Sequence, residues 1–241
     1  MITMTTNQKV TSKMDQKKAR NKKIILDVAS DLFSEKNFDE ITMKDIADKA
    51  LFSRATLFNY FESKEAIYYS IGIQVFHDVI NRTSLVLNQE KSAFDKLIIL
   101  INLFFKGYEQ NLLTREILKF FVTKNNQADI TAEEILLDKK NNPRFNQNKY
   151  TKTELVMVEY VEQIWKYQEI WEGIIKFGQK DGSIKNKSSP KQLTLLIYAI
   201  IFGVINQMDL LKIPLKRAKM SSDYFKNQII KLISFLLLET S

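Results

Sequence analysis

The sequence predicts an all-α protein of about nine helices, in which a small N-terminal domain precedes a larger helical bundle. Turn-forming residues are scarce, because only six Gly and three Pro occur among 241 residues. Apolar side chains recur at steps of three and four along most of the chain, which is the period of an α-helix. No segment shows an alternation of apolar and polar residues that would support a strand.

The N-terminal segment changes character within about 25 residues. Residues 1–15 are polar, and we expect a disordered tail without a secretory signal. Five basic residues follow, and they are Lys17, Lys18, Arg20, Lys22 and Lys23. An apolar stripe then predicts a helix that stops near Asn37. The stripe consists of Ile24, Ile25, Val28, Ala29, Leu32 and Phe33.

Two short helices joined by a tight turn are predicted within residues 42–61. Thr42 and Asp45 have the spacing of a capping box, which places the start of the first helix at Thr42. Ser53 is a good N-cap for the second helix, which ends near Tyr60. Only about three residues separate the two helices, as in a helix-turn-helix.

In a helix-turn-helix, the second short helix enters the major groove of double-stranded DNA. Leu57 and Phe61 are four residues apart and belong to the core, so the remaining side chains point outward. The candidate DNA-binding residues are Thr42, Ser53, Arg54, Ala55, Thr56, Phe58, Asn59, Tyr60 and Lys64. Arg54 suits a guanine edge or a phosphate, whereas Tyr60 and Lys64 suit phosphates. The alternative is an ordinary helical hairpin with incidental polar residues.

These residues resemble the DNA-binding domain of the TetR family of transcriptional regulators. The resemblance is carried by Ile41-Thr42-Met43-Lys44-Asp45-Ile46-Ala47, by Ser53-Arg54-Ala55-Thr56-Leu57-Phe58-Asn59-Tyr60-Phe61 and by Ser63-Lys64-Glu65, with Ala29, Leu32, Phe33 and Phe38 upstream. It covers about residues 17–70. After the disordered tail expected at 1–15, it implies a helix-turn-helix domain at 16–65 and a ligand-binding and dimerisation domain at 66–241.

Three residues depart from the family pattern. Leu51 stands where the family usually has Gly, Ala55 replaces a common Gly, and Phe58 replaces a common Tyr. A left-handed conformation would cost Leu on the order of 1 kcal/mol, which leaves open whether the turn is reshaped.

Beyond residue 70 the sequence shows helical periodicity only. Helices are predicted at residues 94–108, 112–124, 132–137, 154–177, 190–211 and 222–238, with a polar loop at 138–152. The family implies a homodimer through the last two of these helices. The sequence supports it independently, because residues 193–208 are apolar nearly all round and the last helix carries a wide apolar stripe. The alternative is the core of a monomer.

The resemblance also implies a small-molecule effector that acts within the C-terminal bundle. Aromatic residues that could line its site are Phe104, Tyr108, Phe120, Trp165 and Trp171. The alternative is that these aromatic residues only fill the hydrophobic core. The predicted function is a transcriptional repressor that binds a palindromic operator as a homodimer and is released by the effector.

The composition argues against catalysis. The chain has no Cys and one His, so we predict no catalytic residues, no metal site and no cofactor. The longest apolar run, 193–205, is shorter than the roughly 20 residues that a membrane span needs, so we expect a soluble cytoplasmic protein. The rival readings are a helical enzyme and a protein-interaction scaffold, each with a DNA-binding arm.

Overall fold

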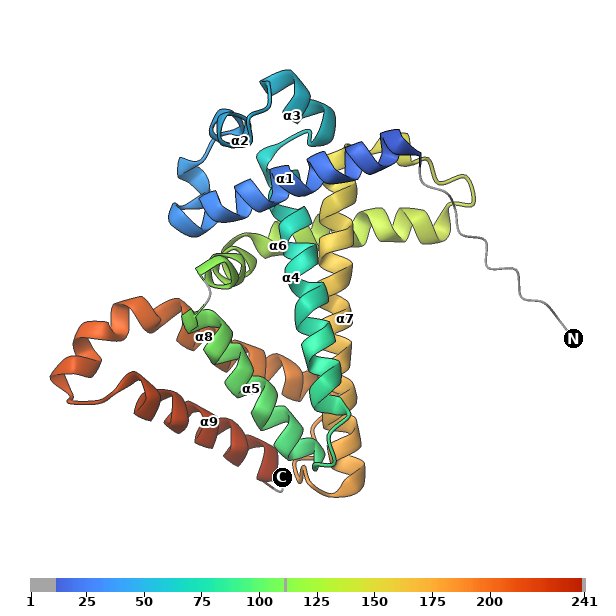
Figure 1. Ribbon diagram of the computed structural model, residues 1–241. Helices are drawn as coiled ribbons and strands as arrows, with labels where there is room; N and C mark the ends of the chain where they lie inside the picture. Colours follow the sequence, from blue (N-terminus) through green and yellow to red (C-terminus); the bar gives the residue numbers. More distant parts are fainter. Residues whose placement is uncertain (1–11, 111, 240–241) are drawn as a thin grey trace, which may run out of the picture.

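The computed structural model describes residues 12–110 and 112–239, and these residues form nine α-helices and two short 3₁₀ helices without a strand (Figure 1). The α-helices are α1 (Lys13–Glu35), α2 (Met43–Lys49), α3 (Arg54–Tyr60), α4 (Lys64–Leu87), α5 (Ala93–Gln110), α6 (Leu112–Asn141), α7 (Lys152–Asp181), α8 (Pro190–Arg217) and α9 (Ser222–Leu238). The 3₁₀ helices are η1 (Phe38–Glu40) and η2 (Gln147–Lys149). The prediction of an all-α protein with about nine helices is confirmed.

The first three helices and the start of α4 enclose a small hydrophobic core at one end of the molecule (Figure 1). Phe33, Ile46, Leu57 and Ile67 are among its fully buried side chains. Ile117 of α6 also belongs to this core. The N-terminal helices therefore rest on the bundle as well as on one another.

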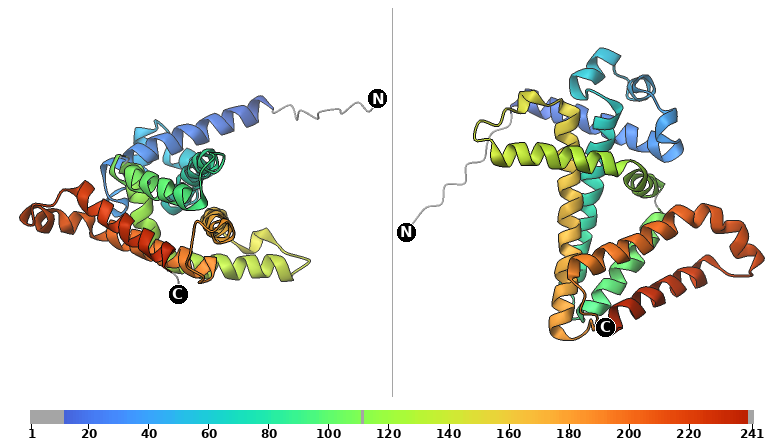
Figure 2. Two further views of the ribbon diagram at one scale, coloured as in Figure 1. Left: turned by 90° about the horizontal axis from the view of Figure 1, so that it is seen from below. Right: turned by 180° about the vertical axis from the view of Figure 1, so that it is seen from behind.

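Helices α4 and α7 run side by side along the length of the molecule (Figure 2). Their contact depends on Gly72, because a Cβ at this position would overlap the ring of Tyr160. Such a Cβ would lie only 2.8 Å from Cδ2 of the ring. Tyr160 is fully buried, and its ring also lies against Tyr69 and Phe76. The aromatic ring thus fills the space that a side chain on α4 would otherwise occupy.

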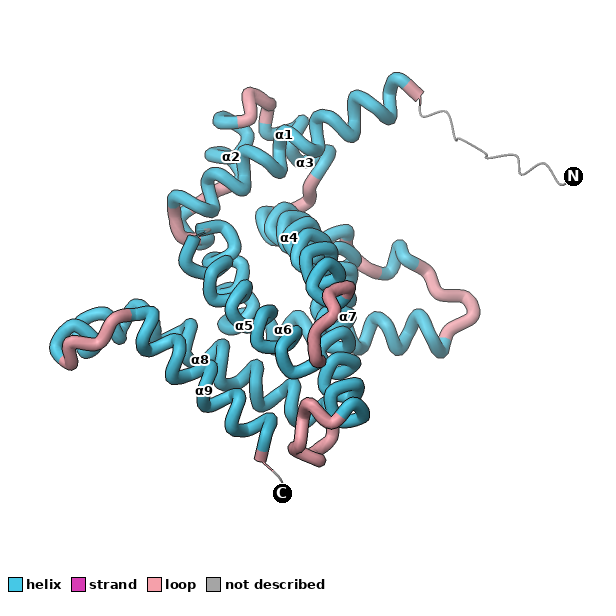
Figure 3. The backbone as a smooth tube through the Cα atoms, turned by 60° about the horizontal axis from the view of Figure 1, so that its bottom comes forward, coloured by secondary structure: helices cyan, strands magenta, loops and turns pink. Residues whose placement is uncertain are grey.

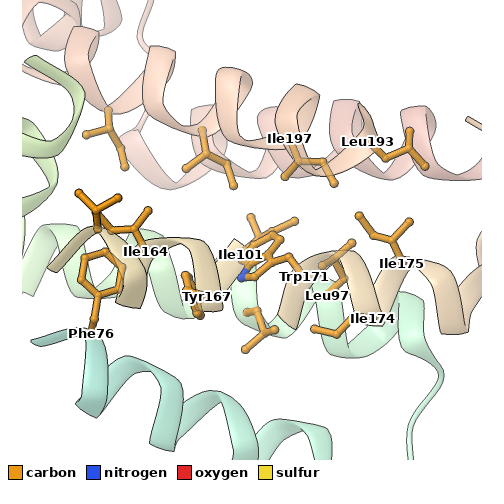
Figure 4. Packing of buried hydrophobic residues seen from close by; sticks show 14 of the residues in the cluster. Phe76, Leu97, Ile101, Ile164, Tyr167, Trp171, Ile174, Ile175, Leu193 and Ile197 are labelled. Carbon is orange, nitrogen blue, oxygen red and sulfur yellow. The ribbon is translucent and has the colours of Figure 1, made fainter. Parts of the chain in front are cut away.

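A second, larger core joins all helices from α4 to α9, and Figure 4 shows part of it. Trp171 of α7 lies at its centre with no exposed surface. Leu97 and Ile101 of α5 approach it from one helix and Ile197 of α8 from another, and all three are buried. This core is the main source of hydrophobic stabilisation in the bundle.

Helices α8 and α9 lie beside each other at the end opposite to α2 and α3 (Figures 1 and 3). Their inner sides carry Ile197, Ile201, Ile233 and Leu237, all of which are buried. The large apolar side chains that remain exposed on these helices are Leu195, Leu196, Leu210, Ile213, Tyr224, Leu232, Phe235 and Leu238. Each of the two helices therefore has one apolar side that is buried in the core and another that is exposed to solvent, which we call its open side.

The first helix begins earlier than predicted. It starts at Lys13, so residues 13–15 are helical and do not belong to a disordered tail. Ser12 caps it, since its hydroxyl accepts a hydrogen bond from the backbone N–H of Asp15 at 3.1 Å. Residues 1–11 lie outside the described part of the chain.

The helices of the bundle are longer than predicted. Residues 112–124 and 132–137 belong to the single helix α6, because the polar residues between them continue the helix. The loop predicted at 138–152 is therefore shorter and contains η2. Helix α7 continues through Gly178 to Asp181, and Gly182 ends it with a φ of 79°.

Helix α8 continues past its predicted end at residue 211, with Pro214 inside the last segment. Its two parts, Pro190–Ile205 and Leu210–Arg217, meet at an angle of 80°. Pro214 lacks an N–H to donate and crowds the carbonyl of Leu210, which weakens the helix at this place. The helix nevertheless continues through Pro214, and the bend between Ile205 and Leu210 precedes the proline.

Among the described residues, no single helix is long and apolar enough to span a membrane. Only the two bent parts of α8, taken together, reach the required length and composition.

Candidate nucleic-acid interface

Helix α2 begins at a reciprocal cap between Thr42 and Asp45. The Thr42 hydroxyl donates a hydrogen bond to the Asp45 carboxylate at 2.6 Å, and the backbone N–H of Thr42 donates to the same oxygen at 2.8 Å. These bonds hold the pKa of the Asp45 carboxyl below its ordinary value of 3.8. Because both Thr42 donors point at Asp45, this geometry gives no support to the prediction that Thr42 also binds a phosphate.

The turn between α2 and α3 is a Schellman motif centred on Leu51. The backbone N–H of Phe52 donates to the carbonyl of Ala47 at 3.0 Å, and that of Leu51 donates to the carbonyl of Asp48 at 3.2 Å. Leu51 has a φ of 57°, and its side chain is 92% exposed. The turn therefore keeps a left-handed residue here, and Leu adopts it at a cost of about 1 kcal/mol.

Helix α3 turns one side to the core and the other to solvent. Leu57 and Phe61 are buried, as predicted. The Ser53 hydroxyl accepts a hydrogen bond from the backbone N–H of Thr56 at 3.0 Å, which confirms Ser53 as the N-cap. The exposed residues of α3 are Arg54, Ala55, Phe58 and Asn59. We call these four residues, together with the half-buried Thr56 and Tyr60, the α3 face.

The hydroxyl of Tyr60 is held in place by α1. The side-chain amide of Asn21 donates a hydrogen bond to the Tyr60 hydroxyl oxygen at 3.0 Å. A hydroxyl that accepts such a bond still has its own proton to donate, so Tyr60 can donate to a phosphate oxygen. Asn21 is not among the site residues predicted from the sequence. The signal that could have found it is its position four residues before the buried Ile25, which places it on the inward side of α1.

Lys64 is the first residue of α4, as predicted, but its ammonium binds within the protein. Its ammonium donates hydrogen bonds to the main-chain carbonyls of Phe38 at 2.6 Å and Ile41 at 2.7 Å. It also lies 4.1 Å from the centre of the Phe38 ring. The ammonium is therefore directed into the protein, where it fixes the loop that leads into α2. This geometry does not support Lys64 as a phosphate contact.

The N-terminal half of α1 carries a dense positive charge next to the α3 face. Its exposed basic residues are Lys13, Lys17, Lys18, Arg20, Lys22 and Lys23. The ammonium of Lys22 lies 5.6 Å from the centre of the Phe61 ring, directly after α3. A group of cations beside an exposed helix face suits a polyanionic partner.

The segment after α3 is also tied to the start of α7. The backbone N–H of Thr153 donates a hydrogen bond to the Glu62 carboxylate at 3.0 Å, and the hydroxyls of Ser63 and Thr153 are 2.9 Å apart. The orientation of α3 therefore depends on α7 as well as on α4.

A pocket of about 440 Å³ lies in the bundle among α4, α5, α6 and α7. Of the aromatic residues predicted to bind a ligand, Phe104 lines this pocket. Trp171 and Trp165 do not, because Trp171 lies in the core and Trp165 packs against it. Tyr108 is buried and lines a separate hollow of about 560 Å³ near the end of α8. The side chain of Phe120 lies outside the described residues.

Comparison with known proteins assigns the N-terminal part of the chain. Residues 25–71 match the model of the family described as bacterial regulatory proteins, tetR family. Among curated proteins, the biofilm operon icaADBC HTH-type negative transcriptional regulator IcaR of Staphylococcus aureus (strain Newman) is 37% identical over 70 residues. That match covers 29% of this chain and 37% of the relative's length.

Solved structures extend the similarity of fold to the bundle. A transcriptional regulator from Saccharomonospora viridis, solved in complex with choline, has a TM-score of 0.64 at 18% identity, over 92% of this chain and 99% of that one. The transcriptional regulator FadR from Bacillus subtilis, solved in complex with stearoyl-CoA, has a TM-score of 0.54 at 18% identity, over 88% of this chain and 96% of its own. At these identities the likeness concerns the fold alone.

The outward-facing α3, the tight turn before it and the bundle behind it define a helix-turn-helix protein with a large helical C-terminal part. With the match at residues 25–71, the N-terminal part of the chain is a helix-turn-helix domain of the kind found in the tetR family of bacterial regulatory proteins. The resemblance noted in the sequence is confirmed.

Proposed function

We propose that this protein is a transcriptional repressor that binds a palindromic DNA operator as a homodimer and releases it when a small molecule binds in the bundle. The observation that carries the proposal is the α3 face, which is exposed on a helix-turn-helix of the tetR family. A negative regulator is among the relatives of this domain. Because the proposed partner is DNA, we expect the protein to act in the cytoplasm.

The α3 face reads the bases. Arg54 stands at the first position of α3, where its guanidinium reaches a guanine edge or a phosphate. Asn59 offers an amide that can pair with adenine, and Thr56 offers a methyl group to thymine. Ala55 leaves room for the helix to approach the groove closely. Phe58, with a side chain that is 50% exposed, adds apolar contact there.

Phosphate contacts come from groups that flank α3. Tyr60 donates its hydroxyl proton to a phosphate, while Asn21 holds the ring in place. The exposed lysines of α1 add charge beside it, and they take the role that we first expected of Lys64 and Thr42. Ser53 contributes indirectly, because it caps the helix that bears Arg54.

The open sides of α8 and α9 form the dimer interface. Leu195 and Leu196 on α8, and Leu232 and Phe235 on α9, are all at least 48% exposed. Apolar side chains gathered in this way over two neighbouring helices mark a surface that another protein covers. A second copy of the chain gives a two-fold pair of α3 faces, which need half-sites roughly 34 Å apart on the operator.

The pocket among α4, α5, α6 and α7 is the effector site. Its volume is in the range of small-molecule sites. Ile117 of α6 lines this pocket and also belongs to the core of the N-terminal helices. A ligand that displaces Ile117 would therefore favour a different setting of those helices. Choline and stearoyl-CoA are ligands of two proteins of similar fold, which supports an effector in principle without naming one.

Selection of bound sequences from a random DNA library tests the proposal. The purified protein should enrich an inverted repeat, with half-sites about one helical turn apart between their centres. A library that emerges without a shared sequence would contradict the proposal and would favour a protein-interaction scaffold.

A further inference from the structure

The effector pocket is apolar along its sides. Phe76 and Val79 line it from α4, and Leu100, Leu103 and Phe104 line it from α5. Phe76 and Leu100 are buried, whereas Leu103 is 45% exposed and lies toward the opening. A ligand that fills this pocket must therefore have an apolar body that packs against these side chains.

Two buried residues with hydroxyl groups stand among these apolar walls. Thr83 of α4 is 2% exposed and Tyr167 of α7 is 7% exposed, and both line the pocket. Burial raises the pKa of the Tyr167 hydroxyl, although the side chains of Trp171 and Thr83 oppose that shift. The hydroxyl thus keeps its proton at neutral pH and can donate a hydrogen bond to a ligand.

The charged side chains among the described residues of the pocket all have one sign. Among the described residues that line it, the charged side chains are Arg82 of α4 and Lys106 of α5, and no Asp or Glu joins them. Both are exposed, and neither forms an ion pair with a described carboxylate. Each can therefore turn to a negatively charged ligand without giving up a partner.

We infer that the effector is an amphipathic carboxylate, with an apolar chain or ring in the body of the pocket and its anionic group at Arg82 or Lys106. An alkylammonium ion would gain contacts with the rings of Phe76 and Phe104 but would meet two positive charges. A neutral alcohol would fill the apolar body but would leave both cations without a partner. The regulatory role of this ligand rests on the proposed function. Its binding to the pocket does not, because binding requires no DNA.

Calorimetric titration of the full-length protein with three probes of equal chain length tests the inference. Decanoate should bind to the pocket. 1-Decanol and decyltrimethylammonium should bind at least about tenfold more weakly, because the alcohol carries no negative charge to pair with Arg82 or Lys106 and the ammonium group is repelled by both. An ammonium probe that binds as tightly as decanoate would overturn the inference that the head group of the effector is anionic.

Charge variants separate the head group from the chain. The double variant Arg82→Gln, Lys106→Gln should lose at least about tenfold in decanoate affinity and keep its 1-decanol affinity. The matched control is Lys176→Gln, an exposed lysine on α7 outside the pocket, which should change neither. Unchanged decanoate affinity in the double variant would overturn the inference.

Two further variants test whether the probes bind in this pocket. Val79→Phe should block the pocket and abolish binding of decanoate and of 1-decanol, with helix content checked by circular dichroism. Leu103→Trp, at an exposed position, gives the same test with less risk to folding. Decanoate that binds normally to both folded variants would place it elsewhere and contradict the inference. These results stand whether or not the protein binds an operator, so a failure here is distinguishable from a failure of the repressor proposal.

Discussion

The side-chain amide of Asn21 on α1 donates a hydrogen bond to the hydroxyl of Tyr60 on α3 at 3.0 Å, and this bond leaves the tyrosine proton free for a phosphate. We predict that Tyr60→Phe weakens DNA binding by roughly threefold to tenfold, the equivalent of one lost hydrogen bond of about 1 kcal/mol. Fluorescence anisotropy with the selected DNA measures this loss. Asn21→Ala should produce a smaller loss, because the tyrosine keeps its proton and loses only its orientation.

The two substitutions should not be additive. In the Tyr60→Phe background, Asn21→Ala should cost almost nothing further in affinity, because there is no hydroxyl left to orient. Equal losses from Asn21→Ala in both backgrounds would show that Asn21 acts on DNA independently of Tyr60.

Lys64 should matter for stability, since its ammonium donates hydrogen bonds to the carbonyls of Phe38 and Ile41. We predict that Lys64→Met lowers the free energy of unfolding of the N-terminal helices by about 1–3 kcal/mol, as expected for hydrogen bonds from a charged donor. Lys44→Met, at an exposed position on α2, is the control and should change stability by less than about 0.5 kcal/mol. Urea denaturation of both variants gives the comparison, and equal stabilities would contradict the structural role.

Replacement of Leu51 by Gly should make the protein more stable. Its φ of 57° strains any residue with a Cβ, and its side chain is 92% exposed, so little packing is lost on removal. Leu51→Gly should therefore stabilise the protein by about 1 kcal/mol, measured as a rise in Tm. Leu51→Ala separates the backbone from the side chain and should leave Tm nearly unchanged. A rise of the same size in both variants would attribute the effect to the exposed leucine side chain instead.

Two glycines inside helices should respond to alanine in opposite ways. At Gly72 a new methyl group would overlap the ring of Tyr160, so Gly72→Ala should destabilise the protein by about 1–3 kcal/mol. At Gly173 on α7 no atom lies within 4 Å of the added Cβ, so Gly173→Ala should stabilise the helix by up to about 1 kcal/mol. Thermal unfolding followed by circular dichroism measures both. Equal effects would show that Tyr160 does not need the space above Gly72.

Much of the N-terminal part of this fold could be predicted, because short-range signals define it. Thr42 and Asp45, and likewise Ser53, lie within one helical turn of the groups that they cap, so spacing alone finds them. The hydrogen bonds of Lys64 could not be predicted, because its partners Phe38 and Ile41 are 26 and 23 residues away along the chain. The same distance in sequence hid the bond between Asn21 and Tyr60.

The residues that line the pocket were predicted less well for a related reason. A tryptophan such as Trp171 has the same helical spacing whether it lines a cavity or fills a core, and here it fills the core. The pocket instead takes one side from each of four helices, and its charge comes from Arg82 and Lys106, which are far apart in the sequence. Only the packing of the helices brings such residues together.

The claim that the α3 face reads DNA is tested most directly by titrating the protein with the selected palindrome and with a scrambled duplex of the same composition. Two chains should bind each palindrome, and the affinity should exceed that for the scrambled duplex at least about a thousandfold. The variant Arg54→Ala, Asn59→Ala should lose most of this preference while it keeps its helix content and its weak, salt-dependent binding to any DNA. Equal affinities of the wild-type protein for the two duplexes, or an unchanged preference in the variant, would contradict the account.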